Sequence, residues 1–358
     1  MGIEQGSTLH ASIKTMNSTL MLIQNLEAGS LLTPTQAESL MEELLSGRMD
    51  TREIVRLLQA LNSRPLAAAE LAGFARVMRQ HAAAVFPAGV ALPEKMVDTC
   101  GTGGDGSGTF NISTAAAIVA SAAGARVAKH GNRSVSSRCG SADVLEVLGI
   151  RIDLPLEHAG RSIREIGIGF LFAPNLHPAM RHAAPVRREL RLRTVFNLIG
   201  PLANPARAGT QLIGTPSPEA AQLMAEALAA LGTDHSFIVH GHDGLDEVTT
   251  TGATDVYEVW TGRVEKHLWM PSDFGVKRAF GQSLLGGDAS RNAEIARDIL
   301  AGAHGPMRDI VLVNAAAGLA AGGLAKDLRH GVQLAEKSID SGAARRKLDA
   351  LQKKYPVS

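Results

Sequence analysis

The sequence has few cysteines, few aromatic residues, almost no net charge and no long apolar run. Two cysteines in 358 residues exclude a disulfide framework or a cysteine zinc site, and favour the reducing cytoplasm. No run reaches the roughly 18 to 20 apolar residues of a membrane span. Residues 1–17 lack the pattern of a secretory signal. The 36 basic side chains nearly balance the 35 acidic ones, which argues against a dedicated nucleic-acid binder.

The N-terminal part of the chain has the pattern of short helices. Thr33 and Asp50 each begin a capping box, with Gln or Glu three residues later. Apolar residues then recur at helical spacing from Ile54 to Leu61. These signals predict a small helical bundle. We expect a flexible tail over residues 1–17 and a helical domain over 18–92, joined in space by helices from about 177–196.

Beyond residue 92, strand and helix patterns alternate. This alternation predicts an α/β domain over residues 93–358, with a central and mainly parallel sheet. Strands are expected at 96–99, 126–129, 169–172, 236–240 and 256–260. Helices are expected from about 113, from 141, and over 177–190, 218–231, 288–303 and 310–321. Two prolines and a glycine make residues 85–93 typical of a linker.

The densest glycine cluster, residues 101–108, lies between a predicted strand and a predicted helix. Glycine allows tight turns and close approach of the backbone to a ligand, and the start of a helix favours an anion such as phosphate. A Walker A loop is excluded because Thr109 and Phe110 follow the last glycine. A dinucleotide fingerprint is matched literally, but the second strand ends in Lys129 and His130 instead of an acidic residue. A turn without a ligand is the simplest alternative.

A second polar segment, residues 129–141, follows the second predicted strand. Its sequence KHGNRSVSSRCGS offers cations, an amide and hydroxyls, which suit a polyanionic ligand. In a doubly wound sheet the ends of neighbouring strands share one crevice. We therefore expect the two loops to face the same ligand.

Together these motifs resemble the anthranilate phosphoribosyltransferase family. The matching runs are GTGGD at 101–105, NIST at 111–114, KHGNR at 129–133, SADVLE at 141–146, HPAM at 177–180, PVR at 185–187, FNLIGPL at 196–202 and GHDGLDE at 241–247. The resemblance extends from about residue 31 to 351. It implies a small helical domain hinged to a larger α/β domain of the nucleoside phosphorylase/phosphoribosyltransferase type, and a homodimer formed through the helical domains.

The family resemblance also implies a reaction and its site residues. Phosphoribose passes from phosphoribosyl pyrophosphate (PRPP) to the amine of anthranilate, with magnesium required, in tryptophan biosynthesis. The residues implied for PRPP are Gly101, Gly104, Asp105, Thr109, Asn111, Ile112, Ser113, Thr114, Lys129, His130, Gly131, Asn132, Arg133, Ser134, Val135, Ser136, Ser137 and Ser141. Those implied for anthranilate are Gly101, Asn132 and Arg187, with His130, His177 and Pro201 as further candidates.

The implied magnesium ligands are Ser113, Asp246 and Glu247, with two ions expected per site. Adjacent carboxylates on a strand would point in opposite directions, but on a loop they can share metal ions. In isolation, two acids in a turn would be read as a solvated surface. No general base is assigned, and His130 and His177 are the candidates for proton transfer, with His130 as the possible catalytic residue.

Lys129 suits a phosphate as a point charge, and Arg187 suits the anthranilate carboxylate as a bidentate donor. Taken alone, a lysine at a strand end and an arginine in a basic cluster would be read as solvated surface. One departure from the family is Arg191, which stands where glycine is expected.

The residues alone are compatible with two other functions. One is a pyrimidine nucleoside phosphorylase, which shares the architecture, and the other is a catalytically silent relative that binds nucleic acid through the basic cluster near Arg187. The acidic pair and the 129–133 motif disfavour the first, and the near-neutral charge disfavours the second. We expect an enzyme acting on small molecules, with neither nucleic acid nor membrane as a partner.

Overall fold

The computed structural model describes residues 18–134, 138–190 and 193–357. Its contacts divide the chain into a smaller unit, Met1–Ala82 with His177–Ala203, and a larger unit, Ala83–Leu176 with Asn204–Ser358. The first segment of the smaller unit ends at Ala82, whereas the sequence suggested residue 92. The tail expected over residues 1–17, and Arg191, lie outside the described residues.

The smaller unit is helical. Residues 18–27 are helical, and the labelled helices are α2 (Pro34–Leu45), α3 (Thr51–Asn62), α4 (Ala68–Gln80), α9 (Ala184–Leu190) and α10 (Phe196–Leu202). Both predicted capping boxes are present. The Thr33 hydroxyl accepts from the Gln36 amide at 3.3 Å, and the Asp50 carboxylate accepts from the Glu53 amide at 2.8 Å. These contacts satisfy backbone donors that a helix start leaves unpaired.

The helix expected over residues 177–190 is interrupted. The chain forms a 3₁₀ turn at Pro178–His182 and only then the helix α9. Pro185 is the second residue of α9, a position where the missing N–H costs nothing, whereas in the middle of a longer helix it would remove a hydrogen bond. The proline therefore explains why one continuous helix does not form.

The larger unit is built on one seven-stranded sheet with the order β3-β2-β1-β4-β5-β6-β7. Strands β1 to β5 are parallel, and β6 and β7 are antiparallel to their neighbours. The mainly parallel sheet and the helical domain confirm the predicted fold class. The strands are β1 (Met96–Gly101), β2 (Arg126–Gly131), β3 (Ile168–Phe172), β4 (Thr210–Gly214), β5 (His235–Gly241), β6 (Thr254–Trp260) and β7 (Arg263–Trp269).

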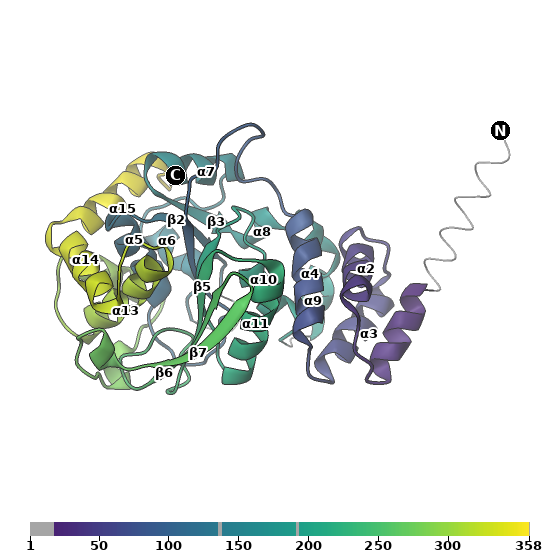
Figure 1. Cartoon of the computed structure of the whole chain (residues 1–358). Coiled ribbons are helices and arrows are strands. Elements are labelled where there is room, and N and C mark those ends of the chain that lie inside the picture. Colours follow the sequence, from purple (N-terminus) through teal and green to yellow (C-terminus); the bar gives the residue numbers. More distant parts are fainter. Residues whose placement is uncertain (1–17, 135–137, 191–192, 358) are drawn as a thin grey trace. The chain divides into compact units, whose positions relative to one another are not determined.

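Helices cover both faces of this sheet (Figure 1). Helices α5 and α13 pack on the central strands, and α11 packs on β5, β6 and β7. Apolar residues from α5, α12, α13 and α15 join those of the strands in one buried core. The helices are α5 (Ile112–Ala122), α6 (Ser141–Val147), α7 (Leu156–Glu165), α8 (Ala173–Leu176), α11 (Pro218–Leu231), α12 (Ala289–Leu300), α13 (Pro306–Ala321), α14 (Leu328–Asp340) and α15 (Ala343–Lys354), with 3₁₀ turns at Pro271–Asp273 and Gly281–Leu284.

The strand order reverses at β1, which lies between β2 and β4. At such a switch point the chain leaves the two neighbouring strands in opposite directions, which opens a crevice at their carboxyl ends. The glycine loop follows β1 at this edge. The Thr102 amide donates to the carbonyl of Gly214, the last residue of β4, at 2.9 Å.

Candidate functional site

The glycine loop connects β1 to α5 through a run of left-handed turns. Gly103, Gly104, Gly106 and Gly108 all have φ between +67° and +76°, a region that side chains with a Cβ rarely occupy. The end of the loop is held by the Gly286 amide, which donates to the Gly108 carbonyl at 2.9 Å. The sequence signal of clustered glycines therefore reflects a backbone requirement that the structure shows directly.

Asp246 and Glu247 lie on the turn after β5, and both reach the elements that follow β1. The Gly103 amide donates to Asp246 Oδ2 at 2.9 Å, and the Ser113 amide donates to Glu247 Oε1 at 3.1 Å. The turn is thus joined to the glycine loop and to the first turn of α5. Two residues adjacent in sequence therefore direct their carboxylates to the two successive segments that follow β1, as a loop allows and a strand does not.

Two glycines make this close approach possible. A Cβ on Gly214 would lie 1.5 Å from the Asp246 carbonyl oxygen, and a Cβ on Gly101 would lie 2.6 Å from Asp246 Oδ2. Gly214 ends β4 and Gly101 ends β1. The carboxylate turn is therefore seated against the ends of the two strands that flank the switch point.

Ionising both carboxyl groups in this environment is energetically unfavourable. Loss of solvent raises the pKa of Asp246, and repulsion from Asp105 raises it further. Loss of solvent also raises the pKa of Glu247, followed by repulsion from Asp246. A cation beside the pair would oppose both effects, because opposite charge favours the ionised form.

Lys129 lies close to these acids at the end of β2. Its side chain is 3% exposed, and its Nζ donates to the Thr99 carbonyl and to Ser113 Oγ. Burial lowers the pKa of Lys129, while Asp98 and Glu247 act in the opposite direction. The lysine therefore reaches Ser113 from β2, as Glu247 does from the turn after β5.

The donor set fits magnesium. Magnesium takes oxygen ligands, and it is usually held by one or two carboxylates together with water and substrate phosphates. Asp246, Glu247 and the Ser113 hydroxyl supply such oxygens at one crevice. Within the described ranges no group of three or more His, Cys, Asp or Glu side chains could hold a metal. Magnesium held by these groups would complete its coordination with water or substrate oxygens.

The second polar loop is described in part. Val135, Ser136 and Ser137 lie outside the described residues. The Ser141 hydroxyl accepts from the Asn132 amide at 3.2 Å, and a Cβ on Gly131 would lie 2.2 Å from that hydroxyl. This contact joins the end of β2 to the start of α6.

Arg133 is already paired with protein carboxylates. Its guanidinium donates to Glu146 at 2.6 and 2.7 Å and to Asp143 at 3.2 Å. The Glu146 hydrogen bond is the main reason why the pKa of Arg133 is raised. In this structure Arg133 holds the loop to α6, and the backbone N–H of Ser134 donates a further hydrogen bond to Asp143 Oδ2 at 3.1 Å.

Three candidate residues for anthranilate belong to the smaller unit. Arg187 of α9 stacks over the Phe196 ring at 5.1 Å and has no carboxylate partner among the described residues. Burial lowers the pKa of His177 to about 4, so its imidazole is neutral at physiological pH. Pro201 is buried within α10. All three residues lie on the segment His177–Ala203 of the smaller unit.

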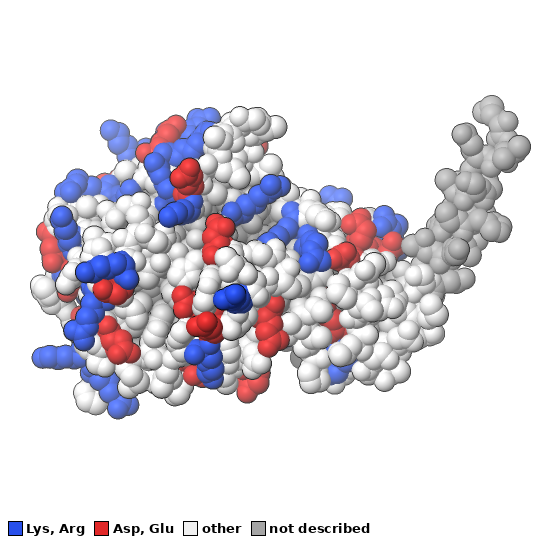
Figure 2. Space-filling view, viewed as in Figure 1, with Lys and Arg blue, Asp and Glu red and all other residues white. Residues whose placement is uncertain are grey.

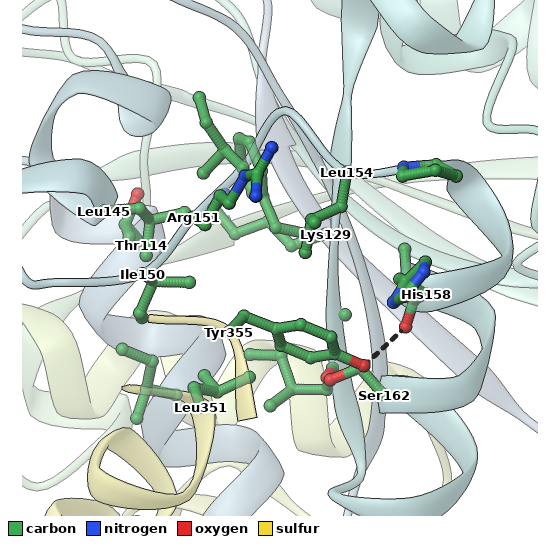
Figure 3. Close-up of a pocket in the computed structure, with 17 residues that line it drawn as sticks. Thr114, Lys129, Leu145, Ile150, Arg151, Leu154, His158, Ser162, Leu351 and Tyr355 are labelled. Atoms are coloured by element: carbon green, nitrogen blue, oxygen red, sulfur yellow. Dashed lines mark hydrogen bonds between the residues drawn. The ribbon is translucent and has the colours of Figure 1, made fainter. Parts of the chain in front are cut away.

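A separate cavity of about 40 Å³ lies in the larger unit behind Lys129 and Thr114 (Figure 3). Its wall is mainly apolar, and the Tyr355 hydroxyl donates across it to the His158 carbonyl at 2.8 Å. Neither carboxylate and no residue of the glycine loop lines it. The chemistry of the candidate site therefore lies at the switch-point crevice and not in this cavity.

Sequence reasoning missed buried polar residues that hold the loops in place. Asp98, fully buried on β1, accepts from the His130 amide at 3.0 Å and from the Asn204 side chain at 2.7 Å. Asn292 of α12 donates to Asn111 Oδ1 at 3.0 Å and accepts from the Gly287 amide at 2.8 Å. A polar residue at a core position of an apolar pattern was the available signal, because such groups are normally hydrogen-bonded.

Two family models match the chain and define its class. Residues 21–82 match the helical bundle domain of the glycosyl transferase family, and residues 93–345 match its α/β domain. The chain therefore belongs to this family, whose two domains correspond to the helical and α/β parts described above.

The most informative relatives place the chain within one branch. It is 56% identical to the anthranilate phosphoribosyltransferase of Solibacter usitatus, over 89% of this chain and 94% of that protein. The crystal structure of the Thermus thermophilus enzyme of that name aligns with a TM-score of 0.86 at 42% identity, covering 93% and 98% of the two chains. The Saccharomyces cerevisiae enzyme in complex with PRPP and Mg aligns at 0.85 and 29% identity, covering 94% and 98%. The chain belongs to the anthranilate phosphoribosyltransferase family.

Proposed function

We propose that this chain transfers phosphoribose from PRPP to the amine of anthranilate, giving N-(5-phosphoribosyl)anthranilate and pyrophosphate in tryptophan biosynthesis. The observation that carries the proposal is the convergence of Asp246, Glu247, Ser113 and Lys129 beside the glycine loop. This set offers oxygen ligands for magnesium and a cation for phosphate in one crevice. Membership of the anthranilate phosphoribosyltransferase family identifies anthranilate as the acceptor and PRPP as the donor.

The reaction is a displacement at C1 of the ribose. The anthranilate nitrogen forms a bond to C1 while the bond from C1 to the pyrophosphate oxygen breaks, and the nitrogen loses one proton. An aniline nitrogen is largely unprotonated at neutral pH, so it needs no strong base before it attacks. Catalysis then depends on positioning the two substrates and on stabilising the leaving group.

The leaving pyrophosphate is assigned to the crevice of the larger unit. The positive end of the α5 dipole lies at the end of the glycine loop and favours an anion such as phosphate. Lys129 contributes a positive charge within reach of Ser113. Asp246, Glu247 and Ser113 would hold magnesium, which supplies neutralisation of the charge that develops on pyrophosphate. We assign two ions to the site, as the family resemblance implies.

The anthranilate carboxylate is assigned to Arg187. A guanidinium can bind a carboxylate through two parallel hydrogen bonds, which orients the ring and its amine. Stacking on Phe196 holds the guanidinium plane. Gly101, Asn132, His130, His177 and Pro201 are the further assigned contacts. His177 serves as a neutral ring in this role, since the pKa of its imidazole is lowered by burial.

Assembly and location complete the proposal. We assign a homodimer formed through the helical domain, which follows from the family resemblance, and a cytoplasmic location, which the low cysteine content favours. In the part of the chain that the structure describes, no helix is long and apolar enough to cross a bilayer. Basic and acidic side chains are interspersed over the viewed face of the larger unit (Figure 2). Light scattering on the purified chain tests the dimer directly.

The experiment that tests the reaction follows anthranilate fluorescence. Purified protein is mixed with anthranilate, PRPP and Mg²⁺, with an EDTA control and a second control in which uridine and phosphate replace both substrates. We expect loss of fluorescence that requires both PRPP and Mg²⁺, and no phosphorolysis of uridine. Folded protein that leaves anthranilate unchanged, or that cleaves uridine instead, would contradict the proposal.

A further inference from the structure

Asn314 is a polar residue inside an apolar helix. It lies in the middle of α13, where Ile310 to Leu319 contains no other polar side chain. Its side chain is fully buried. Helix α13 packs on β1, β4 and β5, so Asn314 belongs to the layer that supports the switch point. A buried side-chain amide costs free energy unless its hydrogen bonds are satisfied, so Asn314 needs hydrogen-bond partners within the core.

Asn314 binds both backbone groups of one residue, Val248. The Val248 amide donates to Asn314 Oδ1 at 2.9 Å, and Asn314 Nδ2 donates to the Val248 carbonyl at 2.9 Å. The same Nδ2 donates to the Ile310 carbonyl at 2.9 Å, which ties the side chain to its own helix. An asparagine side chain has one donor group and one acceptor on the same face, so it can pair with a backbone segment as another strand would.

Val248 directly follows the two carboxylates. Upstream of the pair, the Leu245 amide donates to Asp243 Oδ1 at 3.3 Å. Downstream, the Thr249 amide donates to Thr254 Oγ1 at 3.0 Å. Asp243 lies in the loop itself and Thr254 is the first residue of β6, whereas Asn314 comes from a core helix. Asn314 therefore fixes the turn relative to the sheet and to the strand ends against which Asp246 packs.

We propose that Asn314 is a positioning residue for the magnesium ligands. It holds the backbone at residue 248 so that Asp246 and Glu247, although adjacent, both face the crevice. The inference rests on the proposed function, because it takes these carboxylates as the metal ligands. Groups that orient metal ligands commonly change metal affinity by about 10- to 100-fold when they are removed. A merely structural role would lower stability and leave metal affinity intact.

The test measures metal binding directly as well as activity. Wild type, Asn314→Ala and Asn314→Asp are titrated with Mn²⁺ in the presence of PRPP, and free Mn²⁺ is followed by electron paramagnetic resonance. Asn314→Asp keeps an acceptor for the Val248 amide but loses the donor to the Val248 carbonyl. Ser338→Ala is the matched control, because it removes a buried side-chain bond to the Val119 carbonyl of α5 at 3.3 Å, away from the carboxylate turn. Glu247→Gln is the reference for loss of a ligand.

We expect both Asn314 variants to bind Mn²⁺ about 10-fold or more weakly, with the anthranilate KM within about twofold of wild type. Ser338→Ala should bind Mn²⁺ as wild type does. If Asn314→Ala and Asn314→Asp keep wild-type affinity while Glu247→Gln loses it, the inference is overturned and the proposed site stands. If Glu247→Gln also keeps full affinity, the proposed site itself is wrong. Failure of both Asn314 variants to fold at 25 °C would also overturn the inference, since it would show that the role is not separable from folding.

Discussion

Single residues decide the chemistry through what they contact and how far solvent is excluded from them. Asp246 and Glu247 are adjacent acids in a turn, and their sequence alone fits a solvated loop equally well. The contacts to Gly103 and Ser113 distinguish the two interpretations, because they bring both carboxylates to one crevice. The raised pKa values show that this arrangement is unfavourable without a cation.

Arg187 gives a prediction at this scale. Arg187→Ala should raise the anthranilate KM by about 10-fold or more, because a hydrogen bond to a charged group contributes about 1.5–3 kcal/mol. The KM for PRPP should change little, since that substrate is assigned to the larger unit. Steady-state kinetics with each substrate varied in turn provides the measurement. Arg188→Ala is the control, because Arg188 is the exposed neighbour on α9. An unchanged anthranilate KM in Arg187→Ala would show that another group binds the carboxylate.

At the scale of elements, the site depends on strand ends that carry no side chain. Gly214 ends β4 and Gly101 ends β1, and both admit Asp246 at distances that a Cβ would prevent. The sequence marked Gly101 through its glycine cluster. Gly214 was not identified from the sequence, because it ends β4, a short strand that the alternating pattern did not predict.

Gly214→Ala should therefore displace the carboxylate turn. Its Cβ would meet backbone and not a flexible side chain, so relief requires movement of the turn or of β4, and overpacking of this kind costs about 1–3 kcal/mol or more. We expect at least a 10-fold higher Mg²⁺ requirement for activity, together with a lower thermal midpoint. Gly252→Ala is the control, because nothing lies within 4 Å of a Cβ there. Wild-type Mg²⁺ dependence in Gly214→Ala would show that the position of the carboxylate turn does not determine magnesium binding.

The differences between predicted and observed elements have local causes. The capping boxes at Thr33 and Asp50 were correctly predicted because capping depends on neighbouring residues. The helix expected over 177–190 was wrong because Pro178 and Pro185 divide the segment. Strand β7 was missed because it is an edge strand with exposed charged residues, which obscure the alternation that identifies half-buried strands.

At the scale of the whole molecule, the order of the motifs predicted the fold and the family. The pairing of strands in the sheet then defined the site. The glycine loop, Lys129 and the acidic pair are separated in the sequence, and parallel pairing of β2, β1, β4 and β5 brings the ends of these strands to one edge of the sheet. Asp98, Asn204, Asn292 and Asn314 could not be assigned from one sequence. Their role lies in hydrogen bonds to groups that are distant in the sequence, and residue type and spacing do not specify these.

Stability should depend on pH and on metal in a linked way. The pKa of Asp246 is raised to about 7 in the folded chain, against about 4 in the unfolded chain, and Glu247 is raised as well. The folded state therefore binds more protons than the unfolded state, so these groups lower stability as pH rises toward and through 7. His177, whose pKa is lowered, has the opposite effect below about pH 6.5.

The window from pH 6.5 to 8 separates the effect of the two carboxyl groups on stability from that of His177. Without metal, we expect the thermal midpoint to fall across this window, and to fall less in the double variant Asp246→Asn, Glu247→Gln. Added Mg²⁺ with PRPP should stabilise wild type more at pH 8 than at pH 6.5, since the ionised carboxylates bind the metal. Differential scanning fluorimetry measures both. A midpoint that is independent of pH in wild type and variant alike would contradict the assigned pKa shifts.

The central claim is that Asp246 and Glu247 hold magnesium against the pyrophosphate of PRPP, and a crystal structure of this chain with PRPP and Mg²⁺ tests it most directly. We expect carboxylate oxygens of this pair in the magnesium coordination shell, at about 2.0–2.1 Å or through one bound water, with the pyrophosphate beside the glycine loop and Lys129. Magnesium and pyrophosphate bound elsewhere in the larger unit, with both carboxylates outside that shell, would contradict it.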